Sequence, residues 1–394
     1  MLAMNAAGNA RGTPVRSPDR AGIPGCPGIG PGLRVEPING AGAGDAAPAK
    51  RKPVDMSFLR DQWYAAALST EIDETPFART ICGEPVVLFR TPSGALAALE
   101  DRCAHRHAPL SKGVLKGETI ECCYHGLRYD IDGRCVLVPG QAQIPPRLRV
   151  RRYAVVDRHG WVWLWLGDAE RADPNGIPDF PWFDDPSWSG FQLYFHVDAS
   201  AQLFVDNLLD LSHVAFTHQN SIGAASAADA DADLDSIVDG VMVRGRRALK
   251  GVEPGPFIGR WGNFKGRIDR TSTYIWRPPS NVEIRAEFED ESNKIIIMVI
   301  NPITPETATT AHFWIGWARD FELADAALTE NAKRDNTQVI MEDVEVIEAQ
   351  QRVISSNPGL RAIPINADRA VIAVHKVLER LFAEQAPGRH EAAS

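Results

Sequence analysis

The 394-residue chain lacks several features that would place it in a common functional class. It contains no run of about eighteen apolar residues, so we expect no membrane-spanning helix. Residues 1–20 lack the apolar stretch of a secretory signal, and we therefore expect a cytoplasmic protein. The net charge of −9 argues against nucleic acid or an anionic membrane surface as a partner.

The chain also lacks a fingerprint for flavin or nicotinamide cofactors. Residues 28–32 read GIGPG, but this segment follows no expected strand and opens no expected helix, so we do not interpret it as a nucleotide loop. Cysteine is scarce as well, and six cysteines in a chain of this kind are more typical of metal binding than of a disulfide framework. We expect Cys82 and Cys135 to be ordinary buried thiols.

Composition divides the chain into three parts. Residues 1–55 are rich in Ala, Gly, Pro and Arg and bury too little apolar surface to offset their ordering entropy, so we expect disorder, with Met56 as an alternative initiator. Residues 56–167 alternate short apolar segments with turn signals, which predicts a small antiparallel β domain. Residues 168–394 form the third part, and a Pro- and Asp-rich connector at 173–186 lies near its start.

The third part mixes helical and strand patterns, which predicts an α+β domain with an antiparallel sheet wrapped over helices. We expect helices where apolar residues recur at helical spacing, over residues 199–216, 323–354 and 368–382. Strands are expected around residues 241–244, 269–276, 282–288, 295–300 and 310–317. Residues 221–239 have no clear period and are either a mobile lid or an irregular loop.

The most informative motif is a pair of short loops within residues 56–167. Cys103 and His105 are followed, after sixteen residues, by Cys122 and His125, a C-x-H-x16-C-x2-H spacing. Such a set can hold one structural zinc, or a Rieske [2Fe–2S] cluster in which two Cys bind one iron and two His bind the other. Each loop offers one Cys and one His, which suits two irons better than one zinc. Cys122, and not its neighbour Cys123, has the C-x2-H spacing.

A second metal site is predicted in residues 206–218. Asn207, Asp210 and His213 are three residues apart and share one face of a helix. His218 lies five residues after His213, so both imidazoles reach one metal only if the helix ends or bulges between them. Two His with one carboxylate form the facial triad of non-haem Fe(II) oxygenases. Spacing alone leaves several candidates for the carboxylate on the long helix: Asp335, Glu342, Asp343, Glu345 and Glu348.

From Phe58 to about Ala383 the chain resembles the oxygenase components of the Rieske non-haem iron oxygenases, in particular the vanillate and dicamba O-demethylase type. The resemblance lies in the segments CAHRHAPLSKG, CCYHGLRYDIDGRCVLVPG, GWVWLWLGD, NLLDLSHVAFTH and MEDVEVIEAQQR. It implies a helix-grip-like catalytic domain after the Rieske domain. It also implies a head-to-tail homotrimer, because electrons pass between subunits in this family.

The resemblance further implies a role for each residue of the two motifs. The side chains that would hold the cluster are Cys103, His105, Cys122 and His125. The side chains that would hold the mononuclear Fe(II) are His213, His218 and Asp343. Asp210 matches the carboxylate that links a cluster histidine of one subunit to an iron-ligating histidine of the next. Asn207 matches a polar residue near the iron.

Two positions depart from the pattern of the family. Cys123 stands where many relatives have Pro. Asn301 lies in a segment that often carries a His toward the substrate, so substrate identity does not transfer from the resemblance. His312, nearby in sequence, is equally compatible with a substrate contact and with a hydrogen bond in the core. No functional role is expected for the remaining histidines of the C-terminal part: His196, His375 and His390.

Together these expectations describe a monooxygenase that acts with O2 on an aromatic small molecule. Because the chain carries no flavin or nicotinamide fingerprint, electrons would come from a separate NAD(P)H-dependent reductase of the flavin or ferredoxin type. If the attacked carbon is the methoxy methyl of a vanillate-like acid, the resulting hemiacetal collapses to a phenol and formaldehyde. The alternatives are hydroxylation of a methyl or ring carbon of another aromatic or alicyclic substrate, a non-catalytic Rieske electron carrier, and a zinc-stabilised binding module.

Overall fold

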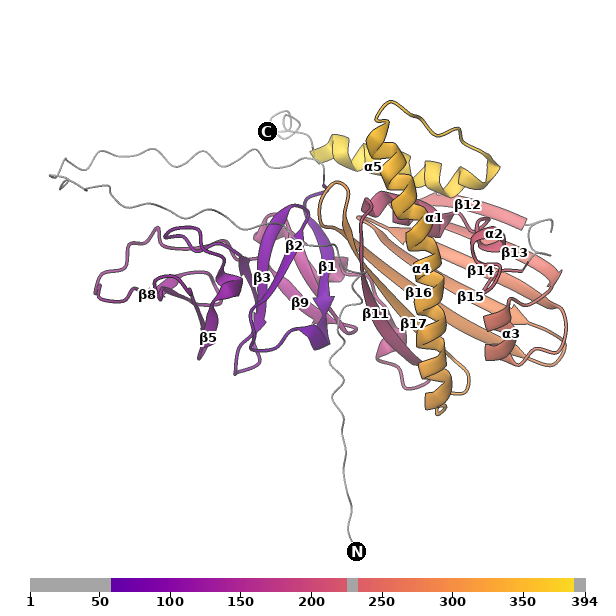
Figure 1. The fold of residues 1–394 in the computed structure, drawn as a ribbon, viewed down its shortest axis with the longest axis horizontal. Coiled ribbons are helices and arrows are strands. Elements are labelled where there is room, and N and C mark those ends of the chain that lie inside the picture. Colours follow the sequence, from indigo (N-terminus) through magenta and orange to yellow (C-terminus); the bar gives the residue numbers. More distant parts are fainter. Residues whose placement is uncertain (1–57, 225–232, 386–394) are drawn as a thin grey trace, which may run out of the picture. The chain divides into compact units, whose positions relative to one another are not determined.

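The structure is a computed structural model and describes residues 58–224 and 233–385 (Figure 1). The segment 1–55, for which the sequence predicts disorder, and His390 lie outside the described residues. No helix in the described ranges is long and apolar enough to cross a bilayer.

Short antiparallel strands build the N-terminal part as three small sheets. The first contains β1 (Gln62–Leu68), β10 (Trp161–Leu166) and β9 (Val155–Arg158), in that order. The second contains β2 (Phe77–Ile81), β3 (Glu84–Arg90) and β4 (Leu96–Glu100). The third contains β5 (Val114–Lys116), β6 (Thr119–Glu121), β7 (Arg128–Tyr129) and β8 (Cys135–Leu137). The hairpins expected from the turn signals are confirmed by the pairs β3–β4, β7–β8 and β9–β10.

Strand β10 is buried on both faces and connects two cores. Val162, Leu164 and Leu166 pack into the small domain together with residues of β1 and β3. The alternate residues Trp161, Trp163 and Trp165 share the other face, as the period-2 pattern predicts, and pack into a separate cluster with residues of β16 and β17. Each buried indole removes on the order of 200 Å² of surface from water, so this layer stabilises the contact strongly.

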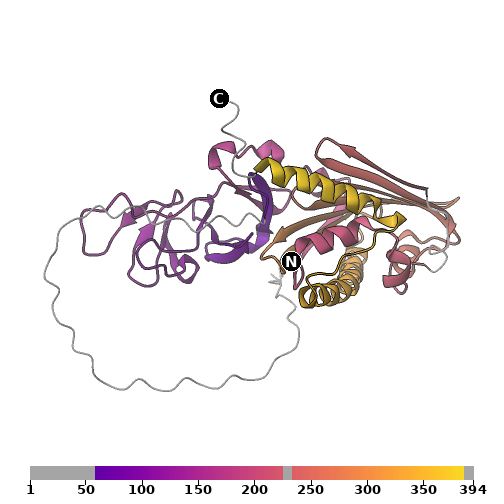
Figure 2. The ribbon, with the colours of Figure 1, turned by 90° about the horizontal axis from the view of Figure 1, so that it is seen from above.

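One seven-stranded antiparallel sheet forms the C-terminal part (Figures 1 and 2). Its order is β11 (Ser189–Val197), β17 (Ala311–Arg319), β16 (Lys294–Pro305), β15 (Asn281–Glu289), β14 (Ile268–Arg277), β13 (Met242–Val252) and β12 (Asp233–Asp239). Four helices cover one face: α1 (Ala201–Leu209), α3 (Pro256–Gly262), α4 (Ala326–Ser356) and α5 (Arg369–Gln385). This arrangement confirms the expected α+β fold with a sheet wrapped over helices.

The sheet alternates as a half-buried surface should. On β16, Ile297 and Val299 face the helices, whereas Met298 and Ile300 face the tryptophan layer of β10. Strand β17 is buried along its whole length because both of its faces are covered. The two long helices expected near the C-terminus are confirmed as α4 and α5. Asp325 caps α4, its carboxylate accepting the backbone N–H of Leu328 at 2.8 Å.

Two expectations were wrong in detail. The helix expected over residues 199–216 is interrupted, since α1 ends at Leu209 and a separate helix, α2, covers Val214–Thr217. Part of the segment 221–239 is the edge strand β12, which its Ala- and Asp-rich sequence did not indicate; residues 225–232 lie outside the described part. In the turn between β9 and β10, the side chain of His159 is 8% exposed and lies between Asp179 and Asp184 of the connector.

Candidate metal centres

The two cysteine–histidine loops have the same backbone hydrogen bonds. The N–H of Cys103 donates to the carbonyl of Ala108 at 2.8 Å, and the N–H of His107 donates back to Cys103 at 2.9 Å. The N–H of Cys122 donates to Leu127 at 2.8 Å and that of Gly126 donates to Cys122 at 3.0 Å, so the spacing is identical. His107 and Gly126, the equivalent residues, both have positive φ, 62° and 71°. The two turns are therefore structural duplicates.

Burial separates the two candidate cysteine ligands from the two candidate histidine ligands. Cys103 and Cys122 are each 2% exposed, whereas His105 and His125 lie at the surface with ring centroids 4.6 Å apart. Cys123 points outward, in keeping with the choice of Cys122 from spacing. This difference in burial fits a two-iron cluster in which the thiolate-bound iron lies in the protein interior and the imidazole-bound iron lies near the surface.

Tyr129 is a contact of this centre that sequence reasoning missed. Its hydroxyl lies 3.2 Å from the sulfur of Cys103 and accepts the N–H of Ala104 at 3.2 Å. Burial, and then the adjacent Cys103, raise the pKa of Tyr129 well above its usual value, so the phenol stays protonated and donates to the sulfur. Burial likewise raises the pKa of the Cys122 thiol when no metal is bound.

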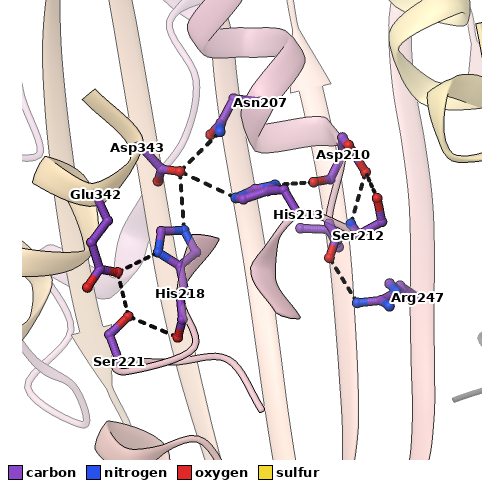
Figure 3. Close-up of polar contacts among 10 residues, drawn as sticks. Asn207, Asp210, Ser212, His213, His218, Ser221, Arg247, Glu342 and Asp343 are labelled. Carbon is purple, nitrogen blue, oxygen red and sulfur yellow. Dashed lines mark hydrogen bonds and ion pairs between the residues drawn. The ribbon is translucent and has the colours of Figure 1, made fainter. Parts of the chain in front are cut away.

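A second group forms where α1 and α2 meet α4 (Figure 3). His213, His218 and Asp343 present ligand atoms that all lie within 4.8 Å of one another. Nε2 of His213 is 3.4 Å from Oδ1 of Asp343, and Nε2 of His218 is 3.2 Å from the same oxygen. In the described ranges no other three His, Cys, Asp or Glu side chains converge in this way. It follows that Cys103, His105, Cys122 and His125 of the first centre do not converge on one point, as the four ligands of a single zinc would have to do.

The interrupted helix explains how two histidines five residues apart reach one point. His213 is the N-cap of α2 and His218 is its C-cap, so a single helical turn separates their side chains. The interruption arises at Asp210, whose carboxylate accepts both the N–H of Ser212 at 2.9 Å and its hydroxyl at 2.6 Å. Such a local side-chain turn competes with helical hydrogen bonding. The sequence predicted that the helix ends or bulges between the histidines, and this is confirmed because α2 ends at Thr217, directly before His218. The break at Asp210 is a second one that lies before both histidines.

Hydrogen bonds on the opposite ring nitrogens orient both imidazoles. Nδ1 of His213 donates to the backbone carbonyl of Asp210, and Nδ1 of His218 lies 2.7 Å from Oε2 of Glu342. Glu342 also accepts the hydroxyl of Ser221 at 2.6 Å (Figure 3). These partners leave both Nε2 atoms directed at Asp343, where each could bind a metal in place of its proton.

The electrostatics of the metal-free centre favour an ionised carboxylate. Burial acts to raise the pKa of Asp343, but hydrogen bonds from His213 and His218 outweigh it and hold the pKa at about 2. Burial acts to lower the pKa of His218, yet the carboxylates of Asp343 and Glu342 raise it above its ordinary value. A divalent cation would replace these protons and neutralise the buried charge.

The structure distinguishes among the five carboxylates that spacing left open. Only Asp343 faces both Nε2 atoms. Glu342 contacts the opposite ring nitrogen of His218, Nδ1, and the sequence did not suggest this role. Asp335 pairs with Arg260 and accepts the indole N–H of Trp261 at 2.9 Å, Glu348 accepts the N–H of Asp198 at 3.1 Å, and Glu345 is exposed. None of these three reaches the centre.

The two polar residues predicted near the iron lie beside the triad. The side-chain amide of Asn207 donates to Oδ1 of Asp343 at 3.0 Å, and its own Oδ1 is buried without a partner. The carboxylate of Asp210 is held by Ser212, as described above, and its carbonyl accepts His213. Asn207 thus contacts the candidate ligand set directly, and Asp210 contacts it through its backbone.

The triad opens into a cavity of about 110 Å³. A cavity of about 150 Å³ accepts benzene, so this space is of the order of a single aromatic ring. The walls are largely apolar, and the few polar groups are Asn207, Arg270, Ser272, Asn301 and Asn336 in addition to the triad. His312 does not line it. Burial lowers the pKa of His312 to about 3, and its ring nitrogens pair with Tyr194 and the carbonyl of Thr80, so its place is in the core.

Comparison with known proteins identifies both halves. Residues 62–153 match the Rieske [2Fe-2S] domain, and residues 197–384 match the vanillate O-demethylase oxygenase C-terminal domain. The putative toluene-4-sulfonate monooxygenase system iron-sulfur subunit of Comamonas testosteroni is 38% identical over 82% of this chain and 97% of its own length. The vanillate O-demethylase oxygenase subunit of a Pseudomonas species is 32% identical over 83% and 96%. The chain belongs to the Rieske non-haem iron oxygenases.

Solved structures of this family support the same assignment. Dicamba monooxygenase bound to 3,6-dichlorosalicylic acid has a TM-score of 0.80 at 32% identity and covers 84% of this chain and 99% of its own. Another crystal structure of that enzyme contains non-haem iron and dicamba. As an oxygenase component of this family, the chain uses a Rieske [2Fe–2S] cluster and a mononuclear non-haem iron. The zinc interpretation of the Cys/His loops is therefore wrong.

Proposed function

We propose that this chain is the oxygenase component of a monooxygenase that O-demethylates a methoxylated, vanillate-like aromatic acid to the phenol and formaldehyde. The observation that carries the proposal is the position of the His213–His218–Asp343 triad in the wall of an apolar, ring-sized cavity. When bound, the iron and the cluster supply the activation of O2 with electrons from outside the chain. The apolar walls exclude water and hold the methoxy carbon near the triad.

We assign the ligands as the geometry favours. Cys103, Cys122, His105 and His125 hold the cluster, and Tyr129 donates to one of its cysteine sulfurs. His213, His218 and Asp343 hold the iron, Asn207 fixes the carboxylate of Asp343, and Glu342 fixes the imidazole of His218. These outer contacts set the ring orientation and tautomer that a metal needs. The Rieske domain comprises residues 56–167 and the catalytic domain residues 168–394.

The proposal includes partners for the electrons. A separate NAD(P)H-dependent reductase of flavin or ferredoxin type reduces the cluster, since the names of the relatives describe subunits or components of larger systems. The chain assembles as a head-to-tail homotrimer in the cytoplasm, and Asp210 links the cluster of one subunit to the iron of the next. The exposure of His105 and His125 supports this arrangement, because their outward rings are free for an inter-subunit contact.

A second reaction has its own support. The higher identity to the toluene-4-sulfonate monooxygenase subunit, 38% against 32% for the vanillate enzyme, favours hydroxylation of an aryl methyl group. Toluene-4-sulfonate carries a methyl group on its ring, and vanillate carries a methoxy group. Either reaction attacks a C–H bond of a one-carbon substituent on an aromatic ring.

The test is turnover with a surrogate reductase and NADH. Vanillate and other methoxybenzoates are assayed for formaldehyde, and 4-methylbenzoate and toluene-4-sulfonate for the benzylic alcohol. Formaldehyde in step with substrate loss supports demethylation, and alcohol without formaldehyde supports the second reaction. His213→Ala should abolish product while retaining the spectrum of the cluster. Undiminished turnover by His213→Ala would indicate an electron carrier instead.

A further inference from the structure

A single cation stands out among the apolar residues of the cavity wall. Strand β14 directs alternate residues toward the helices, and Ile268, Ser272 and Tyr274 on that face are buried. Arg270 occupies the same face and lines the cavity together with the triad. Its guanidinium lies against the ring of Phe288, its cross-strand neighbour on β15, at 5.5 Å from the ring centroid.

Arg270 is half-buried, and its guanidinium has few partners. Within the described ranges one of its five N–H donors is used, from Nη1 to the carbonyl of Ile222 at 3.1 Å. No carboxylate of the described residues forms an ion pair with it, and the charged group nearest in effect is another cation, Arg247. Burial, and then Arg247, lower the pKa of Arg270 to about 10, so it remains protonated at neutral pH.

Arg319 is a structural arginine whose guanidinium has hydrogen-bond partners for most of its donors. Its guanidinium donates four hydrogen bonds at 2.9 to 3.0 Å, to the carbonyls of Phe321, Glu322 and Asp325 and to the hydroxyl of Thr329. Arg270 has no such shell. An unpaired charge against apolar walls is costly, and an incoming anion with two oxygens offsets that cost through charge-assisted hydrogen bonds.

The surroundings restrict where an anion can bind. A cavity of about 10 Å³ on another side of Arg270 has space for about one water, so a ligand must approach from the larger cavity. Asn207 and Asn301 also line that cavity, and their side-chain oxygens are buried without a partner in the described residues; as acceptors they would not bind an anion. Ile222, which accepts from Arg270, follows Ser221, whose hydroxyl is 3.3 Å from the carbonyl of His218. Arg270 is thus hydrogen-bonded to the loop that follows His218, a candidate iron ligand.

We propose that Arg270 is the substrate-binding residue that recognises an oxyanion, so that the substrate is a monocyclic aromatic carboxylate or sulfonate with its charged group on Arg270. The proposal rests on the proposed function and deepens it by adding a requirement for charge. Neutral aromatic ethers and amides leave Arg270 unpaired and bind poorly. With the oxyanion on Arg270, the remainder of the ring extends along the apolar walls toward the triad.

The test is calorimetric binding to the enzyme loaded with both metals. Two anions, 4-methylbenzoate and toluene-4-sulfonate, are compared with their neutral counterparts, 4-methylbenzamide and toluene-4-sulfonamide. The wild type should bind at least one anion about ten-fold or more tighter than its neutral counterpart. The stronger of the two anions then decides between a carboxylate and a sulfonate. A wild type with no preference for either anion would overturn the proposal.

Arg270→Gln separates recognition from structure, because Gln can still donate to Ile222. We expect its affinity for the preferred anion to fall about ten-fold or more while affinity for the neutral counterpart stays within about two-fold. Arg270→Lys keeps the charge and should retain a weakened preference, and it carries the test if Arg270→Gln fails to fold. Arg285→Gln removes a cation paired with Glu287 that does not line the cavity, and it should change nothing. Equal losses for both ligands in Arg270→Gln would show a structural role only.

Binding without turnover distinguishes the two proposals. If anions bind through Arg270 but no methoxybenzoate or methylated acid is oxidised, the proposed reaction is wrong and the recognition stands. If methoxylated acids are oxidised equally well by Arg270→Gln, the recognition is wrong and the reaction stands.

Discussion

At the scale of single residues, the outer contacts of the iron centre matter as much as its ligands. Glu342 is adjacent to Asp343 in sequence, yet the two carboxylates reach His218 from opposite ring nitrogens, at 2.7 Å and 3.2 Å. One therefore orients the imidazole, and the other is the candidate that would share a metal with it. A helix places consecutive residues about 100° apart, which lets α4 supply both groups.

Removal of the outer carboxylate should weaken the iron site without destroying it. We expect Glu342→Ala to lower Fe(II) affinity about 10- to 100-fold, because His218 loses the partner that orients it. Glu342→Gln, which can still accept from Nδ1, should lose less. Chelator competition measures the affinity, and the absorbance of the Rieske cluster serves as the internal control. Equal affinity in wild type and Glu342→Ala would contradict the role given to this contact.

Iron loading should also depend on pH. The pKa of His218 is raised in the metal-free centre, so a proton competes with iron for the imidazole. Apparent Fe(II) affinity should therefore fall as the pH falls through that raised pKa and level off above it. Glu342→Gln should move the fall to lower pH, because it removes one of the two carboxylates that raise the pKa. An affinity that stays constant from roughly pH 8 to pH 6 would contradict this account.

At the scale of elements, the long helix α4 carries Asp343, the proposed iron ligand that lies farthest along the chain. Its N-terminus depends on Asp325, which accepts the N–H of Leu328 and whose carbonyl accepts a hydrogen bond from Arg319. Asp325→Ala should lower the stability of the folded chain by about 1 kcal/mol, the usual cost of a lost N-cap. A lower Tm with unchanged iron and sulfide content would agree. Loss of iron at unchanged Tm would show that the cap acts on the metal site instead.

The same elements show what sequence reasoning could and could not reach. The antiparallel strands of the N-terminal part and the helices α4 and α5 follow local patterns, and these were predicted. The end of α1 was placed too late, because the apolar pattern continues through Leu211 while the turn at Asp210 depends on a side-chain hydrogen bond. Strand β12 was missed because its sequence, DLDSIVD, has few apolar residues and it pairs only at the sheet edge.

Contacts between residues that are far apart in sequence also limited how much of the site could be predicted. His213 and His218 are close in sequence, so their spacing alone suggested a shared metal. The carboxylate that faces them comes from another helix, and no local pattern distinguished Asp343 from the four other candidates on that helix; the resemblance to a family favoured it. Tyr129 and Arg270 carried no signal, since a tyrosine or arginine on a strand is ordinary until its surroundings are known.

At the scale of the whole molecule, the proposed trimer predicts that subunits can complement one another. A chain with Cys122→Ser lacks the cluster, and a chain with Asp343→Ala lacks the iron. Neither should turn over alone. Co-expressed and co-purified with two different tags, the mixed trimers should regain a measurable part of the wild-type rate, because a cluster in one subunit serves the iron of the next. No recovery in verified mixed trimers would place electron transfer within one chain.

The central claim is that the Rieske centre supplies electrons to an iron held by His213, His218 and Asp343. The most direct test is metal and sulfide analysis of the reconstituted wild type and Asp343→Ala, with product formation followed in both. We expect about three irons and two acid-labile sulfides per chain in the wild type. Asp343→Ala should lose about one iron and all turnover while the sulfide content and cluster spectrum remain. Retention of the third iron, or of turnover, by Asp343→Ala would contradict the account.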